Sequence, residues 1–236
     1  RIAGWLIFFC VFISAMADCL PTASNMTRLE FLSDIHYYVR RVFSFDGLIL
    51  LFGLLFLMAG RMVGDRNTGC RDLYMVAPIS KGSYIGGKLL GNFLYTLTLM
   101  YALLFSSLIG FAAFNKTETM FISYITVFFK ISVCIILPAS FFIVASSVML
   151  PEIVDIRLFY LVFAILFLVN VFCVDTGAEA PFYIFMQGDL AKLIWQHPKS
   201  PHIYVESAAL NLLFMLGVGV IAIILVAAKR KFWRTE

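Results

Sequence analysis

Residue types that commonly carry chemistry are few in this chain and form no known catalytic or metal-binding pattern. The three histidines, His36, His197 and His202, lie far apart in the sequence, and no cysteine–histidine spacing matches a metal site. A phosphate-binding loop places a serine or threonine directly after its Gly-Lys pair, whereas Leu89 follows Lys88 here. We therefore expect no catalytic, cofactor or metal site, and the informative residues are charged groups that border apolar stretches.

The composition indicates that lipid is the solvent for most of the chain. Hydrophobic residues make up 62% of the 236 positions and charged residues only 14%, against about 45–50% and about 25% in a typical soluble domain. This balance excludes an ordinary soluble domain, which needs more polar surface, and a disordered chain, which needs low hydrophobicity and high charge. The net charge of +4 is modest, so we expect no nucleic-acid partner.

Six apolar stretches are long enough to be membrane-spanning helices, each of which needs about 20 residues. They run over Gly4–Leu20, Phe43–Val63, Leu89–Phe114, Met120–Leu150, Leu158–Val174 and Ser207–Ala228. Helices are expected rather than barrel strands, because backbone polar groups must be paired in lipid and the stretches show no polar alternation. The predicted fold class is an all-α polytopic membrane protein with one transmembrane domain over residues 1–236, in which Pro138 kinks the fourth span.

Lysine and arginine residues are distributed unequally between two sets of loops. One set holds Arg1, Arg61, Arg66, Arg71, Lys81, Lys88, Arg157, Lys229, Arg230, Lys231 and Arg234. The other set holds Arg28, Arg40, Arg41, Lys116, Lys192 and Lys199. Because loops rich in these residues stay in the cytoplasm, we expect the first set there, both termini inside and the chain in the plasma membrane.

Two features of the outer side leave alternatives open. Ala15-Met16-Ala17 matches a signal-peptide cleavage pattern, but a retained first helix is expected. Cys19 and Cys173 both lie near outer helix ends and could pair, although buried thiols are the simpler interpretation.

The longest stretch between two cytoplasmic span ends, Arg61–Lys88, predicts a short amphipathic helix. Asn67 or Thr68 can cap its start, Pro78 ends it, and Ser80 can cap the helix that follows. A two-turn helix is marginal in water and must be held by other groups. Those groups are either its own bundle and the lipid headgroups or a socket in a cytoplasmic partner, and the spacing alone favours neither.

This loop resembles the corresponding loop of ABC-2-type exporter permeases. The family pattern combines acidic residues, a glycine, a small residue with proline, a serine with a basic residue, and an aromatic residue before Gly-Lys-Leu. The matching positions are Asp65, Gly69, Asp72, Leu73, Ala77, Pro78, Ile79, Ser80, Lys81, Tyr84, Gly87, Lys88 and Leu89. Asp stands here where Glu is frequent in the family, and the six-span layout extends the resemblance over the whole chain.

The resemblance implies the ABC-2 (type V exporter) permease fold and the role of a transmembrane subunit in an ATP-driven exporter. In that family the short helix is a coupling helix that sits in a cleft of a separate ATPase subunit. ATP and Mg²⁺ would be bound by that partner, this chain would be no enzyme, and a second copy or a sister permease would complete the path.

Residues of the loop 64–80, of the helix start that follows and of the inner turn 151–157 are thereby assigned to ATPase coupling. They are Asp65, Gly69, Arg71, Asp72, Leu73, Met75, Pro78, Ser80, Lys81, Lys88, Asp155 and Arg157. Arg71 and Asp72 could supply charge-assisted hydrogen bonds to the partner, and Leu73 or Met75 an apolar plug. For the inner turn, a plain solvated turn is an equal alternative.

Polar residues inside the spans are candidates for a substrate path. Lys130 either faces that path or snorkels at the outer rim of the fourth span. Asn170 and Asn211 either touch cargo or join helices to one another.

The outer segment 175–206 contains Phe182 and Phe185 in an apolar run that is too short to span a membrane. It resembles the re-entrant gating helices of the family, or it packs at the membrane interface. Small permeases of this kind resemble exporters of amphipathic or antimicrobial peptides, such as phenol-soluble modulin exporters, so a peptide toxin or bacteriocin is the expected cargo. Lipid or drug export is the alternative, and an autonomous secondary transporter or channel would need charged pairs or inverted repeats that the spans lack.

Overall fold

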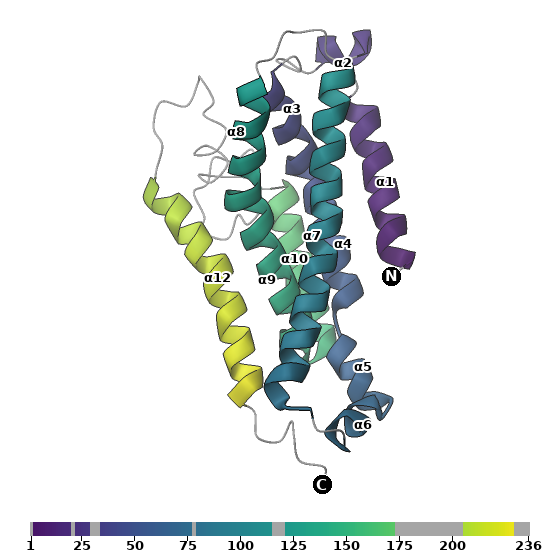
Figure 1. The fold of residues 1–236 in the computed structure, drawn as a ribbon, viewed down its shortest axis with the longest axis vertical. Coiled ribbons are helices and arrows are strands. Elements are labelled where there is room, and N and C mark those ends of the chain that lie inside the picture. The colour runs from purple at the N-terminus through teal and green to yellow at the C-terminus, as the bar shows by residue number, and fades with distance from the viewer. Residues whose placement is uncertain are drawn as a thin grey trace.

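The computed structural model describes residues 2–19, 22–28, 34–76, 79–114, 121–172 and 205–228, and every regular element within these ranges is helical (Figure 1). The elements are α1 (Ile2–Cys19), α2 (Ala23–Arg28), α3 (Ile35–Val42), η1 (Phe43–Gly47), α4 (Leu48–Met58), α5 (Arg61–Asn67), α6 (Cys70–Val76), α7 (Lys81–Phe114), α8 (Phe121–Ile131), η2 (Ser132–Ile136), α9 (Leu137–Met149), η3 (Leu150–Glu152), α10 (Ile156–Phe172) and α12 (Val205–Ala228). The predicted all-α class is confirmed for this part of the chain.

Among the described residues, four helical stretches are long and apolar enough to cross a membrane. They are Ile35–Asn67, Lys81–Ala113, Phe121–Glu152 and Ala209–Ala228. The helices at the first and fifth predicted spans, Ile2–Ala17 and Ile156–Val171, are apolar but shorter. The 17 residues of α10 extend over about 26 Å, slightly less than a hydrocarbon core of about 30 Å.

The centre of the bundle is α9, which packs against α12, α4 and α7. All of its residues except Leu137 and Phe141 are buried, and several of them are alanine or serine. Such small residues let neighbouring helices approach closely. Gly219 of α12 shows this closeness, because a Cβ atom there would lie 2.6 Å from a ring carbon of Phe141.

The helix departs from α-helical geometry just before Pro138. The residues just before it, Ser132–Ile136, form the π-helical turn η2. Proline has no backbone N–H and its ring clashes with the preceding turn, so the backbone rearranges there. A π turn therefore joins α8 to α9 ahead of Pro138, while the predicted kink stays a prediction.

The second predicted span, Phe43–Val63, is interrupted where a continuous helix was expected. Helix α4 ends at Met58, Ala59 is extended with ψ 135°, and Gly60 is left-handed with φ 75°. A Cβ atom on Gly60 would also lie 2.7 Å from Cδ1 of Ile156. Glycine permits both the positive φ and the close approach, so the chain turns here and continues as α5.

Different helices lie at the two ends of the bundle (Figure 1). Helices α5 and α6, the start of α7, the turn η3 and the end of α12 lie together at one end, which we call the α6 end. Helix α2 lies at the opposite end, which we call the α2 end. The 34 residues of α7 extend over about 51 Å, so this helix connects the two ends and is longer than a membrane core.

Candidate functional site

The predicted short helix is present as α6. The residues that precede it do not form the predicted helix cap. Asn67 is the last residue of α5 and Thr68 is its C-cap, so neither residue caps the start of α6. The hydroxyl of Thr68 donates to the carbonyl of Gly64 at 2.9 Å, and Gly69 then reverses the chain with φ 71°. The predicted cap was wrong because the helix before it continues further than the sequence pattern indicated.

The start of α7 follows the prediction. The Ser80 Oγ accepts a hydrogen bond from the backbone N–H of Ser83 at 3.2 Å, which is the geometry of a helix N-cap. The Lys81 ammonium donates to the carbonyl of Ala227, so the start of α7 is tied to the end of α12. The cap and this contact fix where α7 begins.

A buried carboxylate, Glu152, connects α5 and α6 to the turn η3. The Glu152 Oε2 lies 3.5 Å from Nη1 of Arg66 and 3.6 Å from Nη1 of Arg71. The side chain of Glu152 is 0% exposed and that of Arg71 is 9% exposed, whereas Arg66 is 46% exposed. The two guanidinium groups neutralise a carboxylate that would be very costly to bury alone, so Arg71 points into the bundle.

A second ion pair connects α5 to α7. The Lys88 ammonium lies 2.6 Å from Oδ2 of Asp65, and the Tyr84 hydroxyl donates to the same oxygen at 2.7 Å. Both charged side chains are partly exposed, at 28% and 20%. Water therefore screens the attraction between Lys88 and Asp65 more than the attraction between Glu152 and its arginines.

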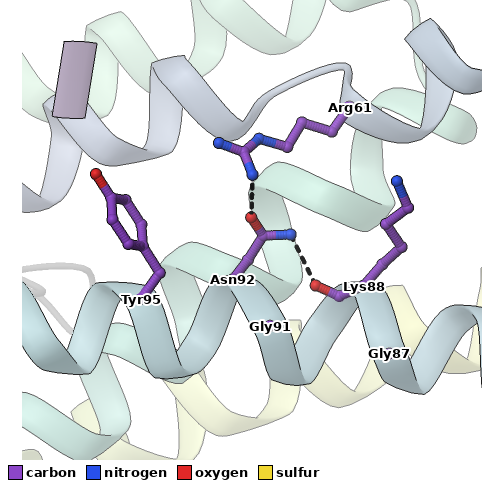
Figure 2. Close-up of a pocket in the computed structure, with 6 residues that line it drawn as sticks. All are labelled: Arg61, Gly87, Lys88, Gly91, Asn92 and Tyr95. Atoms are coloured by element: carbon purple, nitrogen blue, oxygen red, sulfur yellow. Dashed lines mark hydrogen bonds between the residues drawn. The ribbon is translucent and has the colours of Figure 1, made fainter. Parts of the chain in front are cut away.

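A third polar contact joins the corner after α4 to α7 (Figure 2). The Arg61 guanidinium donates to Oδ1 of Asn92 at 2.6 Å, and Nδ2 of Asn92 donates to the carbonyl of Lys88 at 2.7 Å. The second bond fixes the amide of Asn92 with its oxygen toward Arg61. This contact holds the arginine against the surface of α7.

The outer side of α6 is apolar and unusually exposed. Leu73 is 73% exposed and Val76 is 89% exposed, and Ile79 just after the helix is 45% exposed. Because Arg71 of the same helix is buried, α6 has one side attached to the bundle and another that presents apolar groups. An exposed apolar surface of this kind is typical of a contact with a protein or a membrane.

The other predicted coupling residues are only partly placed. Asp155 caps α10, since its Oδ1 accepts from the backbone N–H of Arg157 at 2.7 Å, and both side chains are exposed. Helix α6 contains Asp72 and Met75, whose side chains are not among those described, and Pro78 lies outside the described residues.

The predicted path residues lie on separate helices. Lys130 is half-buried near the end of α8, while Asn170 in α10 and Asn211 in α12 are buried. The Asn170 Nδ2 donates to the carbonyl of Leu166 at 2.8 Å within its own helix. Phe182 and Phe185, the rest of the outer segment 175–206 and Cys173 lie outside the described residues. The substrate path stays a prediction.

Sequence reasoning missed Glu152 as a member of this site. Glu152 lies directly after Pro151, at the end of a long apolar stretch, and is 86 residues from Arg66. An acidic residue at the end of an apolar span is the available signal, but its partners cannot be found from spacing. No family model matches this chain, and neither a curated protein nor a solved structure matches it.

Proposed function

We propose that this chain is the membrane-spanning permease subunit of an ATP-driven exporter, with α6 as the helix that couples it to a separate ATPase subunit. The observation that carries the proposal is the two-sided character of α6. Arg71 attaches the helix to buried Glu152, while Leu73 and Val76 face away from the bundle at 73% and 89% exposure. A coupling element needs both a firm attachment to the spans and a contact surface for a partner.

The polar contacts of the α6 end give this element a route to the spans. Glu152 lies at the end of the α9 segment, and α9 packs against α12, α4 and α7. The Asp65–Lys88 pair connects the same loop to α7, which extends to the other end of the bundle. A displacement of α6 would therefore act on the central helix and on the longest helix together.

Two features support the exporter architecture that we propose: the resemblance of the loop to ABC-2 permeases and the arrangement of the apolar helices. Six spans in an ABC-2 layout would use the four long helices together with α1 and α10. The α6 end would face the cytoplasm of a cell whose plasma membrane holds the chain. The partner ATPase would bind ATP and Mg²⁺, a second copy or sister permease would complete the path, and an amphipathic peptide would be the cargo, with lipid or drug export as the alternative.

A photo-cross-linking residue at Leu73 tests the coupling role directly. We expect it to capture, in native membranes, a chain that binds ATP–agarose and hydrolyses ATP. Val76→Asp should weaken the complex more than about tenfold, because burial of such a side chain contributes about 1.5–3 kcal/mol. Ala228→Asp is the matched control, since Ala228 is exposed at the same end but lies on α12.

Two results would overturn the proposal. One is a captured chain that does not bind ATP; the other is transport by the purified chain in vesicles without any ATPase, which would indicate an autonomous transporter. The expected cargo is tested in the same complex, where amphipathic helical peptides should stimulate ATP hydrolysis. Stimulation by lipids alone would replace the peptide assignment.

A further inference from the structure

A cavity of about 210 Å³ lies at the α6 end between α7 and the corner that follows α4 (Figure 2). Its walls are formed by Arg61, Gly87, Lys88, Gly91, Asn92 and Tyr95. A single enclosed water molecule needs only about 10–15 Å³, so the cavity has room for a group much larger than water.

Arg61 brings a positive charge to this cavity that the neighbouring residues do not neutralise. Its partner in the described part of the chain is the neutral amide of Asn92. Lys88, by contrast, is paired with Asp65 at 2.6 Å. Asn92 holds the guanidinium in place, and the balance of charge favours an anionic group of a single charge next to Arg61.

Two glycines leave part of the α7 side of the cavity without side chains. Gly87 and Gly91 are four residues apart and so lie on the same face of the helix. A Cβ atom on either glycine would meet nothing within 4 Å. These glycines therefore leave space open rather than accommodate a packed neighbour, which distinguishes them from Gly60 and Gly219.

An apolar recess of about 80 Å³ adjoins the polar cavity and shares Arg61 and Tyr95 with it. The remaining walls of the recess come from α1 and α4 and are apolar or small: Ala3, Gly4, Leu54, Leu57 and Met58. The two spaces together fit a ligand with an anionic head and an apolar chain.

The cavity lies at the end of an apolar helix, where the headgroup of such a ligand would lie. Arg61 follows α4, an eleven-residue helix of entirely apolar composition and glycine. An arginine at the end of an apolar span lies where lipid phosphates lie, and basic pockets between spans bind anionic headgroups.

We propose that this cavity is a binding site for an anionic phospholipid. The phosphate accepts hydrogen bonds from the Arg61 guanidinium above the bare face of Gly87 and Gly91. The first part of an acyl chain enters the recess between α1 and α4, and the rest remains in the bilayer. The site is independent of the exporter role and needs only that the chain is embedded in a membrane.

The test uses the full chain, purified in detergent and stripped of lipid, with native mass spectrometry as the readout. Phosphatidylglycerol and phosphatidylcholine are offered in competition, and inorganic phosphate is offered separately. Both lipids offer a phosphate to Arg61, but phosphatidylcholine also brings a quaternary ammonium cation next to it, so we expect phosphatidylglycerol to be retained at least about tenfold better. Equal retention of the two lipids overturns the assignment, and displacement of the lipid by millimolar inorganic phosphate shows that the site binds phosphate without the acyl chain.

Three variants locate the binding in this cavity. Arg61→Gln should abolish the preference for the anionic lipid while keeping a polar group next to Asn92. Gly91→Leu should also weaken binding about tenfold or more, because the new side chain starts from a Cβ position with nothing within 4 Å and would occupy the cavity. Gly86→Leu is the matched control, since Gly86 is exposed on the same helix, has nothing near its Cβ and does not line the cavity. Unchanged binding of phosphatidylglycerol in Gly91→Leu, whatever the behaviour of Arg61→Gln, places the lipid elsewhere.

Discussion

At the scale of single residues, Glu152 has the greatest influence on the α6 end. It is a fully buried carboxylate at the end of the central helical segment, and its partners Arg66 and Arg71 come from α5 and α6. Replacing a whole buried ion pair by apolar groups is often neutral, whereas removing one partner leaves a charge without compensation. The charge that would be left here is chiefly that of Arg71, which is itself 9% exposed.

Glu152→Gln should therefore lower the free energy of unfolding by about 3–5 kcal/mol. The measurement is a denaturant titration of the purified chain in detergent. Asp155→Asn provides the control, because it makes the same acid-to-amide change in the same turn on an exposed residue that can still cap α10. A loss of stability as small in Glu152→Gln as in Asp155→Asn would show that the buried pair does not hold α6.

At the scale of elements, the break between α4 and α5 determines where the α5–α6 loop leaves the bundle. In Gly60→Ala, a residue with a side chain must adopt a left-handed conformation, which costs about 1–2 kcal/mol. The new Cβ atom also lies too close to Cδ1 of Ile156. We expect a loss of about 1–3 kcal/mol in the free energy of unfolding, measured by the same titration.

The control for this element is Gly64→Ala. Gly64 lies within α5 and has nothing within 4 Å of its Cβ position, so alanine should stabilise the helix by up to about 1 kcal/mol. If both alanine variants change stability by the same amount, the break at Gly60 does not depend on glycine.

The same elements show what the sequence could and could not predict. Hydropathy placed the third and sixth spans within α7 and α12, and local chemistry predicted the Ser80 cap. Local chemistry did not predict the break at Gly60, because the close approach of Ile156, which is distant in sequence, arises only in the packed bundle. The ion pairs of Glu152 and the contact of Arg61 with Asn92 were not predicted for the same reason, because only the packed bundle brings these residues together.

At the scale of the whole molecule, the α6 end of the bundle is rich in arginine and lysine. The α6 end gathers basic residues from four helices of the described chain: Arg61, Arg66, Arg71, Lys81, Lys88 and Arg157. Short loops rich in arginine and lysine stay on the cytoplasmic side during insertion. In the proposed exporter, this basic end would lie on the cytoplasmic side, where an ATPase subunit could reach α6.

Single-cysteine labelling in whole cells tests that orientation. Cys70 is exposed at the start of α6, and Thr27 is exposed in α2 at the other end of the bundle (Figure 1). In a background where the other cysteines are replaced by serine, we expect a membrane-impermeant maleimide to label Thr27→Cys in intact cells and Cys70 only after the membrane is opened. The reverse pattern would put α6 outside the cell, where no ATPase could reach it, and would contradict the coupling proposal while leaving the lipid site at Arg61 untouched.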